Sequence, residues 1–372
     1  MTVESPCYLD HNATAPLRPQ AAQAMSSAAV EYGNPSSVHS FGRAARRIVD
    51  DARGRVAALV SARPDDIVFT SGGTEANNLA LRGCGHGRIL ASAVEHPSVL
   101  GAADGIEPIP VDDDGIVDLA ALARLLESRD GPAVVSVMLA NNETGVILPV
   151  AEAARIARQK GALVHCDAVQ AAGRLPLDMA ALGVDMLTLS AHKLGGPKGV
   201  GALVVSESIR LDPIFRGGGQ ERGRRSGTEN LPGIAGFGAA ADAAVAEIDA
   251  AQGTARLRDG LEDHILRDVP RARIIGAGVR RLPNTSCIVL PDIPAETQIM
   301  ALDLAGFAVS AGSACSSGKV KASHVLQAMG LPEEIAGCAI RVSLGLTNDA
   351  LELDRFVAAY TEFAARAGVS AA

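Results

Sequence analysis

The sequence predicts an α/β protein of two units, in which a mainly parallel sheet covered by helices is followed by a smaller α+β unit. Three observations lead to this fold class. The chain has 372 residues, more than a single hydrophobic core usually serves. Short apolar runs alternate with longer helical patterns, as in a parallel sheet that is buried on both faces. The last third of the chain carries fewer strand signals, which favours a smaller second unit.

Strands and helices are expected to alternate through the first two thirds of the chain. Helical patterns cover 74–81 and 150–160. The alanine-rich segment 232–266 has no turn signal at its centre, so we expect one long helix that leads into the second unit. The expected strands are 67–70, 88–92, 133–139, 162–166, 186–189 and 200–205 in the first unit, and 285–290 and 339–343 in the second.

Composition excludes several classes of protein. The net charge is −8, which argues against a bulk binder of nucleic-acid backbone. We therefore interpret the glycine- and arginine-rich segment 216–225 as an interface loop, with an electrostatic contact to a partner protein left open. No apolar run approaches the ~20 residues of a membrane helix. The first ten residues lack a signal-peptide pattern, so a cytoplasmic protein is expected.

The six cysteines are far apart and form no C-x-x-C pair, so neither a preformed metal site nor a disulfide framework is expected. Cys315 differs from the others because it lies in 310–318, a run of small residues without an apolar anchor. Such a run predicts a loop that carries function. Five cysteines lie in or beside apolar patterns and are expected in the core: Cys7, Cys84, Cys166, Cys287 and Cys338.

Residues that follow the expected strands form a candidate site, because ligands of open parallel sheets bind at the carboxyl ends of the strands. After 67–70 come Gly72, Gly73 and Thr74 at the start of a helix, a pattern that can hold a phosphate through backbone N–H groups. The spacing matches neither a dinucleotide fingerprint nor a P-loop. A glycine turn with a helix cap is the alternative interpretation.

Two further strand ends carry ionisable side chains. Asp167 follows 162–166 with Gln170 three residues on, and a carboxylate there requires a cation, several donors or a role as a helix cap. Ser190, His192 and Lys193 follow 186–189. A buried lysine is suited to forming a covalent imine with a carbonyl compound.

Histidine and asparagine follow two other strands. His96 could stack on a flat ring and Asn142 could contact a ligand, whereas a structural histidine and a turn are the alternatives. A phosphate site, a carboxylate and an imine-forming lysine are together the parts that pyridoxal 5′-phosphate requires. The set therefore indicates this cofactor more strongly than any single member does.

Blocks of sequence in a fixed order carry a family resemblance that covers nearly the whole chain. The chain resembles the NifS/IscS-like cysteine desulfurases, within the fold-type-I, class-V aminotransferase group of pyridoxal-phosphate enzymes. The matching blocks are 8–16, 70–77, 95–97, 141–145, 165–170, 190–193, 225–229, 310–316 and 340–345.

The resemblance implies a domain organisation and a cofactor attachment. A large domain, 15–255, would hold a mostly parallel seven-stranded sheet covered by helices. A small α+β domain, 1–14 and 256–372, would carry the catalytic-cysteine loop at about 310–320. Lys193 would form the covalent imine, and Gly73, Thr74, Ser190 and His192 would bind the cofactor, the last three at its phosphate.

The resemblance also implies roles around the ring and the substrate. Asp167 would pair with the pyridine nitrogen and Gln170 with the ring hydroxyl. His96 would stack on the ring and act in catalysis. Asn142 would orient cofactor or substrate, and Arg341 would bind the substrate carboxylate, a bidentate task that suits guanidinium geometry.

The activity implied is removal of sulfur from L-cysteine to give L-alanine and a persulfide on Cys315. Sulfur would pass to an acceptor or iron–sulfur scaffold protein for iron–sulfur cluster or thio-cofactor biosynthesis, and Cys315 is also a candidate for a transient iron–sulfur ligand. Thr228 would reach the cofactor phosphate of a second subunit, which implies a homodimer with shared sites. The alternatives are a selenocysteine lyase or aminotransferase-like enzyme on the same scaffold, and a non-catalytic sulfur or cluster assembly factor.

Overall fold

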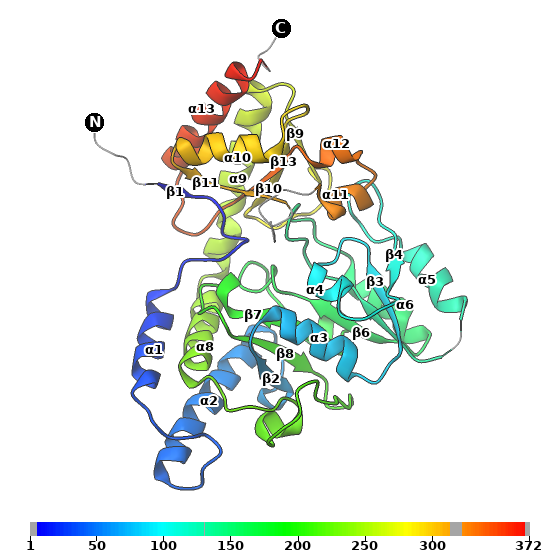
Figure 1. The fold of residues 1–372 in the computed structure, drawn as a ribbon, viewed down its shortest axis with the longest axis vertical. Helices are drawn as coiled ribbons and strands as arrows, with labels where there is room; N and C mark the ends of the chain where they lie inside the picture. The colour runs from blue at the N-terminus through cyan, green and yellow to red at the C-terminus, as the bar shows by residue number, and fades with distance from the viewer. Residues whose placement is uncertain (1–5, 130, 313–321, 369–372) are drawn as a thin grey trace.

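A seven-stranded sheet forms the centre of the larger unit, and the smaller unit lies above it in Figure 1. The computed structural model describes residues 6–129, 131–312 and 322–368. The sheet has the order β2 (Ile67–Thr70), β8 (Gly201–Val205), β7 (Met186–Ser190), β6 (Leu163–Asp167), β5 (Ala133–Ser136), β3 (Arg88–Ser92) and β4 (Glu107–Ile109).

The sheet is mostly parallel, as predicted, with one strand reversed. Neighbouring strands from β7 to β4 run parallel, whereas β8 is antiparallel to both β7 and β2. The connection 191–200 explains the reversal, because it is shorter than the crossover that a parallel neighbour would need. Strand β5 ends at Ser136 and not at 139, although Val137 and Leu139 still donate backbone hydrogen bonds to β6 residues.

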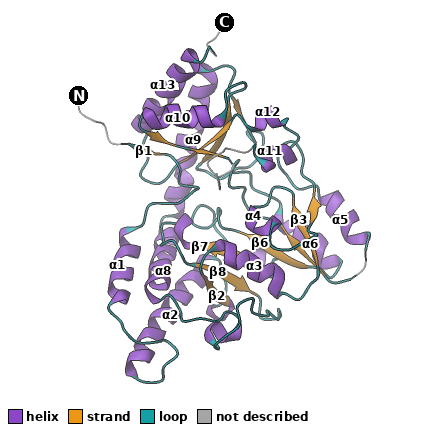
Figure 2. Cartoon of the chain, in the orientation of Figure 1, coloured by secondary structure: helices purple, strands orange, loops and turns teal. Residues whose placement is uncertain are grey.

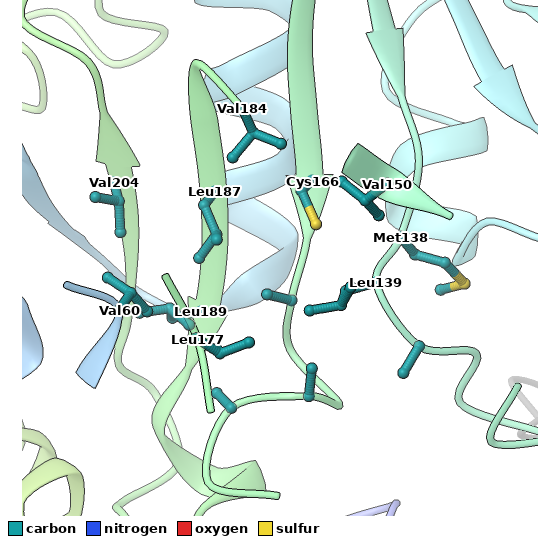
Figure 3. Close-up of a cluster of buried hydrophobic side chains, with 14 of the residues drawn as sticks. Val60, Met138, Leu139, Val150, Cys166, Leu177, Val184, Leu187, Leu189 and Val204 are labelled. Atoms are coloured by element: carbon teal, nitrogen blue, oxygen red, sulfur yellow. The ribbon is translucent and has the colours of Figure 1, made fainter. Parts of the chain in front are cut away.

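Both faces of this sheet are buried, which accounts for the apolar runs. Ile67 and Phe69 of β2 belong to the hydrophobic cluster on one face, and Val68 between them belongs to the cluster on the other. Cys166 of β6 lies among the aliphatic side chains of the first cluster (Figure 3). All five described cysteines are buried, as predicted.

Helices cover the two faces unequally (Figure 2). One face packs against α1 (Pro19–Ala29), α2 (Ser40–Leu59), α5 (Leu119–Glu127), α6 (Val150–Gln159) and α8 (Leu231–Ala246). The other face packs against α3 (Gly73–Gly83) and α4 (Pro97–Leu100). Short helical turns complete the unit: η1 (Pro64–Asp66), α7 (Met179–Leu182), η2 (Ala191–Lys193) and η3 (Gln220–Gly223).

The expected single helix over 232–266 is wrong. The structure has α8 and then α9 (Ile248–Asp268), which meet at an angle of 67°. Glu247 stands at the break and forms an ion pair with Arg18, a partner more than two hundred residues away. The break falls at a residue with a tertiary partner and not at a glycine or proline, so the sequence carries no such signal for it. No single described helix is long and apolar enough to cross a membrane, and only this bent pair passes that test jointly.

The smaller unit is built on an antiparallel sheet with its own aromatic core around Phe356 and Tyr360. The sheet has the order β12 (Ser310–Ala311), β13 (Ala339–Ser343), β10 (Thr285–Val289) and β9 (Arg273–Ile274). The N-terminal strand β1 (Cys7–Tyr8) pairs with β11 (Phe307–Ala308) beside it. The helices are α10 (Ala295–Leu304), α11 (His324–Ala328), α12 (Glu333–Ala336) and α13 (Ala350–Arg366).

Candidate active site

Polar side chains of three adjacent strands gather on the face of the large sheet that α3 covers. Because alternate residues of a strand point to the same side, Ser136, His165, Asp167, Thr188 and Ser190 share this face. A Cβ added at Gly73 of α3 would lie 3.5 Å from Cβ of Ser190, which places the helix start directly over the strand end. The carboxyl ends of the parallel strands therefore form a polar site, as predicted.

A cavity of about 480 Å³ lies at the start of α3. Its lining brings together Gly73, Thr74, Ser190 and His192, all predicted to bind the cofactor. The first N–H groups of a helix lack intrahelical acceptors, so this lining suits a phosphate. We call it the anion cradle, and its full lining is Ala13, Thr14, Ser71, Gly72, Gly73, Thr74, Glu75, Ser190, His192, Lys198 and Gly199.

Strand β8 packs closely against the loop that begins the anion cradle. A Cβ at Gly201 would lie 2.7 Å from the backbone of Gly72, so β8 can approach this loop only without a side chain. Thr14 and Lys198 also line the cradle and were missed by the sequence analysis. Thr14 comes from the N-terminal segment, residues 8–18, which leads from β1 to α1; its Oγ1 lies 3.2 Å from Nδ1 of His192. Only the fold brings this segment to the sheet.

Lys193 lies beside the anion cradle, with its amine turned toward the N-terminal segment. Its Nζ donates to the carbonyl oxygens of Asn12 (2.6 Å) and Ala13 (2.9 Å). The side chain lines a second cavity of about 520 Å³ rather than the cradle itself. Burial, reinforced by the guanidinium groups of Arg341 and Arg174, lowers the pKa of Lys193 to about 7. The amine therefore loses its proton readily near neutral pH, as a nucleophile or base must.

Asp167 ends β6 as a buried carboxylate that is 6% exposed. Its Oδ1 accepts from the backbone N–H of Val169 (3.0 Å), which is the capping role considered as the alternative. Its Oδ2 accepts from Nδ2 of Asn77 in α3 (2.7 Å). A carboxylate oxygen has room for a second donor, so Asp167 can cap the turn and still receive a ring N–H.

Gln170 lies under the N-terminal segment. Its Nε2 donates to the carbonyl oxygen of Asn12 (3.1 Å), and its Oε1 accepts from Nη1 of Arg174 (2.6 Å). One N–H of the amide is left for a further acceptor. The orientation of Gln170 thus depends on Arg174, a buried residue that the sequence analysis missed.

His96 is exposed at the head of α4. Its Nδ1 accepts from the backbone N–H of Ser98 (3.1 Å) and lies 2.7 Å from Ser98 Oγ. Partial desolvation lowers the pKa of His96, while the charge of Asp167 opposes that shift. Nδ1 is thereby held as an acceptor, and Nε2 faces away from this contact.

Arg341 of β13 comes from the smaller unit to the same site. Its Nη2 donates to Oδ1 of Asp10 (2.7 Å) and its Nη1 to the carbonyl oxygen of Asn142 (3.0 Å). Its Nε is buried without a hydrogen-bond partner among the described residues. A buried donor without a partner is costly, and a ligand carboxylate would supply the missing acceptor.

Two predicted site residues lie apart from this arrangement. Thr228 is exposed, in a segment held against α3 by the ion pair of Arg225 with Glu75 (2.8 Å). Cys315 lies outside the described residues. Near the two ends of the described chain around it, Ser323 donates a hydrogen bond to the buried carboxylate of Glu143, and a Cβ added at Gly312 would clash with the same carboxylate.

A buried hydrogen-bond chain beneath the site was also missed. Thr188 Oγ1 lies 3.0 Å from Nε2 of His165, whose Nδ1 lies 2.9 Å from Ser136 Oγ, and Ser136 donates to Oε1 of Glu95 (3.2 Å). Burial lowers the pKa of His165 to about 4, and burial beside Asp167 holds the pKa of Glu95 well above its usual range. The sequence signal that could have revealed this hydrogen-bond chain is the presence of polar residues inside apolar strands.

Metal binding has no preformed site in the part of the chain that the structure describes. No group of three or more histidine, cysteine, aspartate or glutamate side chains could hold an ion there. The chemistry of the site instead depends on an anion cradle, a carboxylate, a lysine of lowered pKa and an arginine with an unused donor.

Known proteins are similar to this chain in sequence and fold. The chain matches the family described as aminotransferase class-V over residues 7–356. It is 46% identical to a curated cysteine desulfurase of Cereibacter sphaeroides over 366 residues, 94% of this chain and 93% of that protein. A curated cysteine desulfurase IscS of Dictyoglomus turgidum is 41% identical, with 91% of this chain and 89% of that protein covered. The X-ray structure of a NifS-like protein from Rickettsia africae superposes with a TM-score of 0.89 at 38% identity, covering 96% of this chain and 99% of that one.

Proposed function

We propose a residue-level assignment for this chain, which belongs to the aminotransferase class-V family and is a cysteine desulfurase. One observation carries the assignment. The anion cradle, the carboxylate of Asp167 and the amine of Lys193 lie at one edge of one sheet, and Arg341 reaches the same edge from the smaller unit.

Pyridoxal 5′-phosphate is the proposed cofactor, because the residues present fit its groups. It supplies an electron-withdrawing ring that can store the charge left when an amino acid loses its α proton. Thr74, Ser190 and His192 would hold the phosphate, with Gly73 leaving space for it at the start of α3. Asp167 would accept the ring N–H and keep the nitrogen protonated.

Further side chains would orient the ring and the substrate. Gln170 would donate its remaining amide N–H to the ring hydroxyl, and His96 would lie against the ring face. Arg341 would bind the carboxylate of L-cysteine, for which its free Nε is the supporting observation. Asn142 would help to orient the bound molecule, from a position fixed by two hydrogen bonds to its carbonyl oxygen.

Lys193 would act twice, first as the point of covalent attachment and then as a base. With a pKa of about 7, its amine can take up the α proton of the substrate and return a proton at neutral pH. His96 would assist by relaying a proton at Nε2, because Nδ1 is engaged by Ser98.

Cys315 is the proposed sulfur acceptor. Its thiolate would attack the substrate sulfur, so that an S–S bond forms as the substrate C–S bond breaks. Cysteine and the Cys315 thiol then become alanine and a Cys315 persulfide, with the displaced β carbon gaining one proton. Transfer to an acceptor or iron–sulfur scaffold protein would follow.

Assembly and location are proposed on the same basis. We propose a homodimer in which Thr228 completes the anion cradle of the partner subunit; the exposure of Thr228 supports it, because a residue that reaches a second subunit lies on the surface of its own. The domains would be 15–255 and 1–14 with 256–372, the latter supported by the pairing of β1 with β11. A cytoplasmic location stays a prediction.

Replacing Cys315 with alanine tests the assignment most simply. We expect the absorbance of bound cofactor to persist while alanine formation from L-cysteine falls by at least about a hundredfold. Cys84→Ala is the matched control, because that thiol is buried at the end of α3. Sustained alanine formation by Cys315→Ala would refute the role of Cys315, and a parallel assay with selenocysteine would separate lyase activity from desulfurase activity.

A further inference from the structure

Asn12 is a fully buried polar residue at the junction of the two units. It has 0% exposure, and each of its hydrogen-bonding groups has a partner. Its backbone N–H donates to Oγ of Ser343 (2.9 Å), and its Oδ1 accepts from Nδ2 of Asn284 (3.2 Å). Its Nδ2 donates to Oγ1 of Thr285 (2.9 Å) and to the carbonyl oxygen of Asn142 (3.2 Å). The side chain cannot rotate without losing three hydrogen bonds.

The backbone carbonyl of Asn12 is directed to the site. Its oxygen accepts from Nζ of Lys193 (2.6 Å) and from Nε2 of Gln170 (3.1 Å). The carbonyl oxygen of Ala13 accepts from the same lysine at 2.9 Å. Two carbonyl oxygens thus accept hydrogen bonds from the free amine of Lys193, and both belong to the N-terminal segment rather than to β7 or the turn η2 that carries the lysine.

These carbonyls stabilise the charged form of the amine. Burial and the nearby Arg341 and Arg174 disfavour an ammonium group at Lys193, whereas the carboxylates of Asp10 and Asp167 favour it. Hydrogen bonds to the charged form favour it as well. The proton affinity of the free amine therefore depends on how firmly these carbonyls are held, and the side chain of Asn12 contributes three hydrogen bonds to holding them.

We propose that Asn12 is a positioning residue for Lys193: its amide side chain fixes the backbone carbonyls of Asn12 and Ala13, which receive the lysine ammonium group whenever that amine is not covalently attached. The proposal deepens the proposed function, on which its catalytic consequence rests. The contact between Asn12 and Lys193 itself does not depend on the cofactor.

A matched control separates positioning from stability. Asn348 is also a buried asparagine, 9% exposed, and it too anchors the N-terminal segment through Nδ2 to the carbonyl oxygen of Tyr8 (3.3 Å). It accepts from Gly345 N–H and donates to Glu352, and no hydrogen bond joins it to Lys193 or Gln170. Asn348→Ala should therefore lower the free energy of unfolding without changing the pKa of Lys193.

The test measures the reactivity of Lys193 without the cofactor. Full-length chain stripped of cofactor is acetylated at a series of pH values with a trace of acetic anhydride, and labelling of Lys193 is measured by peptide mass spectrometry. For Asn12→Ala we expect the apparent pKa of Lys193 to fall by half a unit or more, with kcat about tenfold lower and KM for cysteine within about threefold. Asn348→Ala should match the native chain in the apparent pKa of Lys193, in kcat and in KM.

A milder variant covers the case in which Asn12→Ala does not fold. Thr285→Val keeps the shape of that side chain but removes the acceptor for Nδ2 of Asn12, and it should shift the pKa of Lys193 in the same direction by less. An unchanged or raised pKa in these variants, or an equal shift in Asn348→Ala, would overturn the proposal. A native chain that neither binds pyridoxal phosphate nor forms alanine would defeat the proposed function instead, whatever the labelling shows.

Discussion

Asn77 of α3 donates a 2.7 Å hydrogen bond to Oδ2 of Asp167 at the end of β6, and the same amide group donates to Oγ of Ser98. The carboxylate is therefore held between a helix and its own strand. This relationship was not visible in the sequence, where the two residues are ninety positions apart.

Removing this hydrogen bond should loosen the carboxylate without removing its charge. We expect Asn77→Ala to bind pyridoxal phosphate about tenfold more weakly and to shift the absorbance of the bound form, because Asp167 would no longer be held in one orientation. Equilibrium dialysis and absorbance spectra measure both effects. Asn78→Ala, one residue along the same helix, is the control; cofactor affinity equal in all three proteins would contradict the assigned role of Asn77.

The buried imidazole of His165 predicts a loss of stability in acid. Its pKa in the folded chain is about 4, below the ordinary value near 6.5, so the unfolded chain takes up a proton first as pH falls. With respect to this group, the free energy of unfolding is highest above pH 6.5. It falls as pH is lowered toward 4, by at most about 1.4 kcal/mol per pH unit. Urea unfolding between pH 7.5 and 4.5 measures it.

His165→Gln is the comparison that isolates this effect, because His11 and His192, whose pKa burial also lowers to about 4, remain in both proteins. The stability difference between native chain and variant should shrink as pH falls. A difference that does not vary with pH would show that His165 titrates normally.

The raised pKa of Glu95 predicts that stability falls as pH rises, the opposite of the effect of His165. Burial beside Asp167 holds its pKa well above the usual range, so between the unfolded and the folded pKa the unfolded chain has already lost the proton that the folded chain retains. The carboxyl therefore lowers stability progressively as pH rises above about 4.3. Glu95→Gln keeps an acceptor for Ser136 and should be more stable than the native chain at pH 7.5 but not at pH 4.

Glu107 is the control for Glu95, because its pKa is shifted in the opposite direction. Its hydrogen-bonded pairing with Arg88 lowers the pKa of Glu107, so Glu107→Gln should lose stability at neutral pH. Urea unfolding of both variants at two pH values is sufficient. If Glu95→Gln were less stable than the native chain at pH 7.5, Glu95 would have to be ionised in the folded protein.

The lowered pKa of Lys193 predicts how fast the cofactor attaches. Only the unprotonated amine reacts with an aldehyde, so the rate of pyridoxal phosphate attachment to the cofactor-free chain should rise through about pH 7 and level off above pH 8. Stopped-flow absorbance at fixed cofactor concentration measures the rate. A rate still rising tenfold per unit at pH 9 would indicate an ordinary lysine.

The sequence predicted the parts of this site that lie at strand ends. Alternation and apolar runs located β2, β3, β6 and β7, and the residues after them included Thr74, Asp167 and Lys193. Parts fixed by contacts between distant segments could not be found in this way. Glu247 at the bend pairs with the distant Arg18, and Lys193 donates its hydrogen bonds to the carbonyl oxygens of Asn12 and Ala13, in a segment that only the fold returns to the sheet.

The identity of the attachment residue tests the central claim most directly. Pyridoxal phosphate bound to the purified chain is fixed by borohydride reduction, and the modified peptide is identified by mass spectrometry. The account predicts the phosphopyridoxyl group on Lys193 alone, and none on the protein after Lys193→Ala. Modification of another lysine in preference to Lys193, or no stable modification at all, would contradict it.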